Sequence, residues 1–203
     1  VCLQGFIGWD MVKSGLEVNI DVSHFRLATH LTLALIILSI ILWFLYELYG
    51  IKKFNNKISN FFLYFFFVLI FLQISLGAFL AGLDGGKLYN TWPDMNGFFF
   101  PNDTKLYEYF QFDSFKDPSI IQFYHRLTGY LILIFLIILN YHFFSKKINK
   151  NPILVFNIFI LLQIILGILA LISGVDIKYA SLHQIGSIFV LSSYLLILYK
   201  NFN

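Results

Sequence analysis

The sequence of 203 residues is 59% hydrophobic, 20% aromatic and only 12% charged, with a formal net charge of +3. Its mean hydropathy of +0.77 and low charge exclude a soluble domain, which carries about 25% charged residues. Composition therefore predicts an integral membrane protein. The small positive charge forms no basic stripe interleaved with exposed aromatics, which excludes the nucleic-acid-binding classes. A single cysteine, Cys2, excludes a disulfide framework, a thiolate metal cluster and covalent haem attachment.

Apolar runs set the predicted helices. A span needs about 20 residues to cross about 30 Å of hydrocarbon, and five runs reach that length: residues 30–49, 60–83, 120–144, 153–174 and 182–199. The first sixteen residues lack an initial Met, a basic stretch and a cleavage site, so they are not typical of a signal peptide. We expect them to be the outer half of a further span in a truncated sequence. The predicted fold class is all-α integral membrane, with five complete transmembrane helices plus the end of a sixth.

Lysines mark one side of the membrane. They cluster after the first complete span, after the third and at the end of the last: Lys52, Lys53, Lys57, Lys146, Lys147, Lys150 and Lys200. The positive-inside rule places these clusters in the cytoplasm. Residues 10–26, 84–118 and 175–180 then face outward. In bacteria this predicts a multi-pass protein of the inner membrane.

One hexapeptide pattern, Leu-Gln-x-x-x-Gly, occurs three times. The copies begin at Leu3, Leu72 and Leu162, and each precedes an outward loop and a new apolar run that carries a histidine. Gln and Gly in this spacing share one face of a helix. Helix packing alone explains such a face, so we interpret the motif chiefly as a marker of repetition.

The three following histidines, His30, His125 and His183, each come early in an inward-running span. Similar depth in neighbouring membrane helices is typical of a bis-imidazole haem pocket. The alternative is a set of polar groups bonded across helices. His24 is expected in a loop and His142 near the inner end, so neither is predicted to be a ligand.

Arg126 directly follows the second of these histidines. A guanidinium beside a haem ligand at the membrane edge is suited to pair with a propionate. Anchoring at the membrane interface is the alternative.

Pairing gives a domain hypothesis. A low-spin haem needs two axial ligands, and three histidine helices leave one unmatched. We expect residues 1–50 to be the remnant of an N-terminal helical bundle, and residues 51–203 to form a complete antiparallel four-helix haem-binding bundle. His125 and His183 are the predicted pair in that bundle. The outer segment 84–118 is dense in Gly, Asn, Asp, Pro and aromatics, which favours an ordered lid over a tether.

Several strings closely resemble the haem A synthase family, in its mitochondrial-like class. They are GWDMVKSGL at 8–16, VSHFRLATHL at 22–31, GAFLAGLDGGKLYNTWPDMNG at 77–97, QFYHRLTGY at 122–130, LLQIILGI at 161–168 and LHQIGS at 182–187. The resemblance implies an eight-helix oxidoreductase that oxidises the C8 methyl of haem O to a formyl group, giving haem A for cytochrome oxidase. Two successive hydroxylations, followed by loss of water, are generally proposed for this family.

The resemblance also assigns residues and partners. It implies that His125 and His183 ligate the iron of a resident haem b, and that His30 serves the substrate haem O. The family's proposed catalytic acidic residue lies upstream of Val1, so no residue here is assigned to it and this chain is expected to be incomplete as a catalyst. Implied partners are membrane lipid, the synthase that makes haem O, and assembly proteins of cytochrome oxidase, with no nucleic acid.

Two other classes remain open. A membrane di-haem cytochrome b that carries electrons usually needs haems in both leaflets, and His142 alone cannot build the inner one. An assembly scaffold or a transporter would use the histidines for packing or proton relay. Broken helices with charges near their centres would favour transport, and no complete predicted span has one.

Overall fold

The structure, a computed structural model, describes residues 2–16 and 21–202. Six α-helices occur in these described residues: α1 (Cys2–Leu16), α2 (His24–Leu48), α3 (Asn60–Gly82), α4 (Pro118–Ser145), α5 (Asn151–Ile172) and α6 (Ile177–Asn201). Helices α2 to α6 are long and apolar enough to cross a membrane. The all-α class and the five complete spans are therefore confirmed. Helix α1 is the shorter predicted sixth element, and residues 17–20 of the outer segment 10–26 lie outside the described part.

Helix starts differ from the predicted ones because polar residues cap the helices before the apolar runs begin. The side chain of Asp117 accepts hydrogen bonds from the backbone N–H groups of Ser119 and Ile120 at the start of α4. Asp176 accepts one from the backbone of Lys178 at the start of α6. Such caps satisfy the free N–H groups of the first turn. Helices α4 and α6 consequently begin earlier than hydropathy alone indicates.

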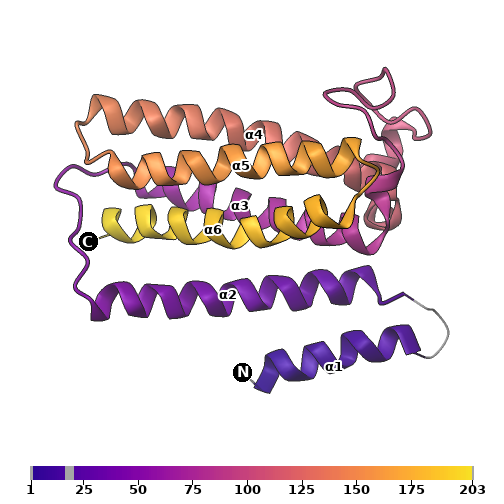
Figure 1. The fold of residues 1–203 in the computed structure, drawn as a ribbon, viewed down its shortest axis with the longest axis horizontal. Helices are drawn as coiled ribbons and strands as arrows, with labels where there is room; N and C mark the ends of the chain where they lie inside the picture. Colours follow the sequence, from indigo (N-terminus) through magenta and orange to yellow (C-terminus); the bar gives the residue numbers. More distant parts are fainter. Residues whose placement is uncertain (1, 17–20, 203) are drawn as a thin grey trace.

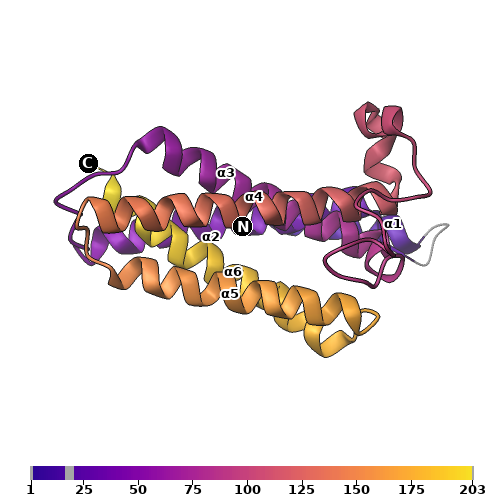
Figure 2. The same ribbon diagram turned by 90° about the horizontal axis from the view of Figure 1, so that it is seen from above.

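The helices run antiparallel as a bundle of near-parallel rods (Figure 1). Hairpins α3–α4 and α5–α6 form the two main layers, while α2 packs on α3 and α6, and α1 lies outside α2. Turned by 90°, the α5–α6 hairpin diverges from α4 toward the end that carries the long α3–α4 connection (Figure 2). Helices α4 and α6 thus occupy a diagonal of the four-helix arrangement.

The packed core occupies the half of the bundle away from the α3–α4 connection. Its fully buried side chains include Phe66, Phe143, Phe156 and Tyr194, and the Tyr194 hydroxyl donates a hydrogen bond of 2.7 Å to the Leu63 carbonyl. In contrast, no residue from 161 to 186, all of them described, is buried. The half of α5–α6 nearer the α3–α4 connection is therefore not closed by side-chain packing. Leu35 of α2 belongs to the same core, so α2 packs as a fifth helix on the four-helix arrangement.

Lysines of the inner loops hold the C-terminal end of α6. Lys53 Nζ donates to the Tyr199 carbonyl at 3.2 Å, and Lys57 Nζ donates to the Phe202 carbonyl at 3.4 Å. Cations at a helix C-terminus are favourable because the helix dipole is negative there. The predicted grouping of lysine loops at one end of the molecule agrees with this arrangement, and the α3–α4 connection lies at the other end (Figure 1).

We call the segment between α3 and α4, residues 83–117, the lid. It is ordered by three 3₁₀ helices, Gly85–Lys87, Leu106–Phe110 and Phe112–Lys116. Tyr89 and Met95 of the lid are buried in a small cluster with Phe123 of α4. The lid is therefore packed onto the N-terminal end of α4, as an ordered segment.

Candidate functional site

Each copy of the repeated hexapeptide lies against one of the three histidines. Gln4 and Gly8 of α1 contact His30 of α2. In the second copy, the contact is from α3 to His125 of α4, and in the third from α5 to His183 of α6. A Gln-Gly helix and a histidine helix thus form one antiparallel unit, and the unit occurs three times.

Glycine is required in these units because the imidazole occupies the place of a side chain. A Cβ atom on Gly8 would stand 2.9 Å from Cε1 of His30. On Gly77 it would stand 3.3 Å from Cε1 of His125. The first distance is shorter than real Cβ contacts essentially ever are, and the second is tighter than nine in ten of them, so in both units the ring packs directly against the glycine backbone. The sequence favours helix packing as the role of this glycine. In the structure, the histidine ring packs directly against the glycine.

The imidazoles of His125 and His183 face one another across the diagonal of the bundle. Their ring centroids are 6.4 Å apart and their planes are inclined by 80°. Two imidazoles that share one metal ion have ring centres on the order of 6 Å apart, because each metal–nitrogen bond is about 2 Å. The ring spacing therefore matches that of two axial ligands on one iron ion.

His183 is in the protonation state that a ligand requires. Its Nδ1 lies 3.0 Å from the backbone carbonyl of Gln163, and an Nδ1–H donor there leaves the Nε2 lone pair for a metal. The Gln163 amide in turn donates to the His183 carbonyl at 2.6 Å. His125 differs, because its Nδ1 is buried without a hydrogen-bond partner. His183 Nε2 is thus free for a metal, whereas His125 Nε2 lies 3.3 Å from the amide nitrogen of Gln73, which would have to turn away before this nitrogen could bind iron.

Arg126 is directed to the lid. Its Nη1 donates to the Thr91 carbonyl at 2.9 Å and to that of Asp94, and its Nη2 donates to the Tyr89 carbonyl at 2.8 Å. Its Nε is buried without a partner. Three carbonyls of one segment converge on one guanidinium, which fixes the lid over the helix turn that carries His125. The predicted propionate contact stays a prediction, and Nε is the atom left for it.

A second set of polar contacts fastens the lid through Asp103. The Tyr89 hydroxyl donates to Oδ1 at 2.7 Å, and the Ser119 hydroxyl donates to Oδ2 at 2.6 Å. Burial acts to raise the pKa of Asp103, but the hydrogen bonds from Ser119 and Tyr89 outweigh it and hold the pKa below its usual value. Burial and the hydrogen bond to Asp103 raise the pKa of Tyr89. These contacts add to those of Arg126, and the side chains of Gln122, Tyr124 and Tyr130 of α4 also donate to lid carbonyls.

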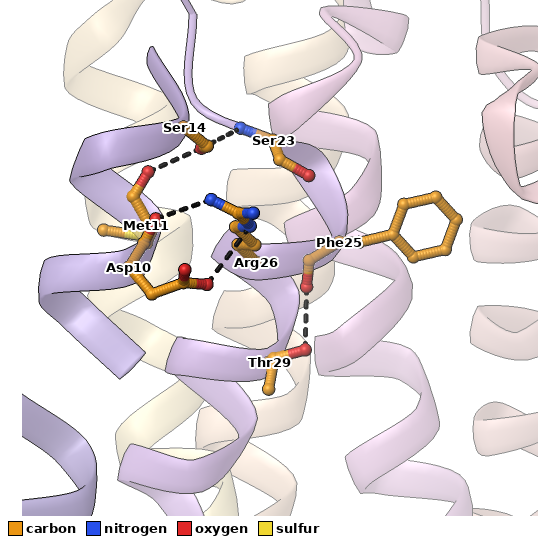
Figure 3. A network of polar contacts seen from close by, with 7 residues as sticks. All are labelled: Asp10, Met11, Ser14, Ser23, Phe25, Arg26 and Thr29. Atoms are coloured by element: carbon orange, nitrogen blue, oxygen red, sulfur yellow. Dashed lines mark hydrogen bonds and ion pairs between the residues drawn. The ribbon is translucent and has the colours of Figure 1, made fainter. Parts of the chain in front are cut away.

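The His30 unit carries an ion pair at its outer end (Figure 3). Arg26 Nε lies 3.1 Å from Asp10 Oδ2, and its Nη1 donates to the Asp10 carbonyl at 2.8 Å. Ser14 Oγ accepts a hydrogen bond of 2.9 Å from the backbone of Ser23 nearby. Helices α1 and α2 are therefore clamped together just outward of His30, and this unit is separate from the His125–His183 pair.

The two remaining histidines lie apart from these units. His24 is the first residue of α2, so the expectation that it lies in a loop was wrong; Ser23 takes the position before the first helical turn. The ring of His24 packs against Phe25 and Phe79. His142, far along α4, packs edge-on against Phe62. The neighbouring rings named here are all phenylalanine rings, not those of other histidines.

Comparison with known proteins identifies the family. The sequence profile of a family described as Cytochrome oxidase assembly protein matches residues 1–195. The chain belongs to this family. The resemblance to haem A synthases is confirmed by relatives of that name. This member of the cytochrome oxidase assembly family is 62% identical over 203 residues to the haem A synthase of Pelagibacter ubique. It is 40% identical over 199 residues to that of Rickettsia africae and 36% identical over 196 residues to that of Wolbachia pipientis.

The alignments cover a larger share of this chain than of its relatives. The Pelagibacter alignment takes in 100% of this chain and 60% of the relative, and the Rickettsia alignment takes in 94% and 58%. The chain therefore spans about three fifths of the length of the curated relatives it matches.

Proposed function

We propose that this chain takes part in haem A synthesis, the oxidation of the C8 methyl of haem O to a formyl group that supplies cytochrome oxidase. The observation that carries the proposal is the pair of imidazoles, His125 and His183, with ring centroids 6.4 Å apart. The haem A synthases among its relatives support the substrate and the reaction. The chain would act as an oxidoreductase.

The proposed roles follow the units. His125 and His183 would hold haem b, whose iron supplies one-electron transfer when it is bound. His30, on its own hairpin with Gln4 and Gly8, would serve the substrate haem. This division keeps the proposed organisation of residues 1–50 and 51–203 into two haem-binding parts.

The protein's own residues would orient and shield the reacting haems. Arg126 and Asp103 fasten the lid to α4, and an ordered cover at the outer end limits the access of water to the site. Arg126 Nε would remain for a haem propionate. We place the lid and the histidines toward the outer face of the inner membrane, with lipid, the haem O synthase and oxidase assembly proteins as partners.

Resident haem is tested with histidine variants. We expect the purified chain to show a bis-histidine, low-spin haem spectrum that His125→Ala and His183→Ala each abolish. His142→Ala is the matched control, because its ring packs on Phe62 and should leave the spectrum intact. Unchanged spectra in both ligand variants would reject the assignment.

The reaction is tested by extracting haems from membranes that contain the protein and a supply of haem O. Haem A or a hydroxylated intermediate, separated by chromatography, would support the synthase. Recovery of haem b alone would indicate an electron carrier. Recovery of no haem would indicate a scaffold.

A further inference from the structure

Three consecutive phenylalanines form an exposed tip on the lid. Phe98, Phe99 and Phe100, which we call the lid tip, are 54%, 61% and 50% exposed. A closed turn holds them in place, because the backbone N–H of Met95 donates to the Phe98 carbonyl at 2.7 Å and the N–H of Phe98 donates back at 3.3 Å. The rings of Phe99 and Phe100 pack against Phe123 of α4. The lid tip is therefore an ordered surface that presents aromatic side chains away from the bundle.

The lid tip carries no charge, and the nearest carboxylates along the chain have partners of their own. Asp94 Oδ1 accepts hydrogen bonds from the Thr91 hydroxyl at 2.7 Å and from the backbone of Gly97 at 3.1 Å. Asp103 accepts from Tyr89 and Ser119, as described above. Contiguous exposed apolar side chains of this kind are uncommon on a surface that faces water. An apolar environment around the lid tip would leave no charge of the tip unpaired.

The exposed side of α4 continues the apolar surface of the lid tip. Phe99 and Pro93 of the lid line a shallow cleft together with Leu127 and Tyr130 of α4, and the Tyr130 hydroxyl donates to the Pro93 carbonyl at 3.0 Å. From Leu127 onward, the same face of α4 carries a stripe of exposed apolar side chains, which continues through Leu131, Ile134, Ile138 and Tyr141. On a helix that spans a membrane, such a stripe contacts lipid. The lid tip thus lies at one end of a surface that faces lipid.

The length of α4 sets the depth of this junction. The helix has 28 residues, and at about 1.5 Å per residue it exceeds the roughly 20 residues that cross the hydrocarbon. It ends at Ser145, and Lys146 and Lys147 mark the membrane boundary there. Counting back about 20 residues from that boundary leads to Arg126, so Leu127 lies at the edge of the hydrocarbon. Phe99 shares the cleft of Leu127 and therefore lies at the same level. Part of the lid also extends past α4 to the side of the bundle (Figure 1).

We infer that the lid tip is a membrane anchor, whose phenylalanines insert into the lipid interface beside α4. The partner is the bilayer itself, because aromatic rings favour the boundary between headgroups and hydrocarbon. The uncharged tip fits a surface of zwitterionic lipids and needs no anionic headgroups. The lid is then held from two sides, by Arg126 on the bundle and by lipid at its tip. This inference depends on the membrane character of the chain and not on the proposed haem chemistry.

The test measures how deeply single labelled positions are immersed. Cys2→Ser removes the one native cysteine, and Phe99→Cys then carries a nitroxide spin label in vesicles of phosphatidylcholine and phosphatidylethanolamine. Asp113→Cys is the control, because the Asp113 side chain is charged and 74% exposed. Electron paramagnetic resonance gives the accessibility of each label to oxygen, which concentrates in the bilayer, and to a water-soluble nickel complex. We expect the ratio of oxygen to nickel accessibility to be severalfold higher at position 99 than at position 113.

Equal ratios at the two positions would reject the inference. The lid tip would then face water, where it would be open to a protein partner instead of lipid. If Phe99→Cys does not accumulate, Phe98→Cys takes the same label with the same expectation, because Phe98 contacts Met95 through its backbone. A nickel-accessible label at position 98 would also reject the inference. The measurement works equally on protein without haem, so a failure to bind haem would reject the proposed function and leave the membrane anchor standing.

Discussion

Gly167 and His183 are in direct contact across the α5–α6 interface: a Cβ atom on Gly167 would stand 2.8 Å from Cε1 of the imidazole. Real Cβ atoms essentially never approach another atom so closely. Nδ1 of His183 also forms a hydrogen bond with the Gln163 carbonyl, one turn earlier on α5. Its position is therefore set from two sides by the backbone of one helix.

This contact predicts that Gly167→Ala displaces the imidazole. The added methyl group must push the ring away, and overpacking of this kind costs about 1–3 kcal/mol. We expect the ratio of haem to protein to fall severalfold. Gly77→Ala should have a smaller effect, because the corresponding distance is 3.3 Å. The ratio is measured by haem extraction from purified protein.

Gly5→Ala is the matched control for these glycine variants. It is also a helical glycine, but nothing lies within 4 Å of a Cβ built there. We expect unchanged haem content in this variant. A Gly167→Ala protein with the full haem content would contradict the argument that the ring rests on the backbone.

Two asparagines pair within the predicted membrane region of α4 and α5. Asn140 Nδ2 donates to Asn157 Oδ1 at 3.0 Å, and Asn157 Nδ2 donates back to Asn140 Oδ1 at 2.8 Å. Interhelical hydrogen bonds in membrane proteins contribute about 0.6 to 2 kcal/mol. We expect Asn140→Leu to lower the free energy of unfolding by about 1 kcal/mol, measured by denaturant titration in detergent.

The double variant separates the pair from its members. The double variant Asn140→Leu with Asn157→Leu leaves no amide unpaired. Its loss of unfolding free energy should therefore be smaller than the sum of the losses in the two single variants. Additive losses in the double variant would show that the two amides do not interact.

Arg126→Gln should loosen the lid. The change removes hydrogen bonds from a charged donor to the carbonyls of Tyr89 and Thr91, each contributing about 1.5–3 kcal/mol. The Tyr89 carbonyl keeps its hydrogen bond from Gln122, so we expect a net loss of at least about 1.5 kcal/mol. Trypsin should then cut after Lys105 at least about tenfold faster, since about 1.4 kcal/mol is a factor of ten in an equilibrium. Lys87→Gln loses only an exposed ion pair with Asp84, so trypsin should cut this variant after Lys105 at the wild-type rate. Equal rates in Arg126→Gln and wild type would count against the anchor.

The lowered pKa of Asp103 predicts that acid destabilises the lid. Its pKa in the folded protein is lowered by the hydrogen bonds from Ser119 and Tyr89, against the opposing and larger single effect of burial. A lowered carboxyl pKa stabilises the fold above the unfolded value of about 3.9, and this stabilisation is lost as pH falls through the folded-state value. We expect amide protection in the lid to decline over that acid range.

Asp103→Asn gives the control for this pH dependence. The amide cannot ionise, so lid protection should be lower than in wild type at neutral pH and should lack the acid step. Hydrogen exchange, corrected for the intrinsic effect of pH, measures both. A variant that keeps the acid step would assign it to another group.

The sequence alone was sufficient for the all-α membrane class and the five spans. Each of these depends on properties that add residue by residue, such as transfer into hydrocarbon and the rise of a helix. His125 could be placed near the outer end of its helix by counting from the lid. Helix starts were less exact, because Asp117 and Asp176 cap helices in a polar stretch that hydropathy does not recognise.

Only the tertiary structure decided what these residues touch. The motif glycine and glutamine could be placed on one helix face, but their partner depends on how two helices are rotated and how closely they cross. The structure brought the rings of His125 and His183 within 6.4 Å of each other, with their planes nearly perpendicular, and showed that Arg126 donates to the lid carbonyls. These contacts join residues far apart in the chain, and their distances follow from packing between helices, which no local pattern of residues specifies.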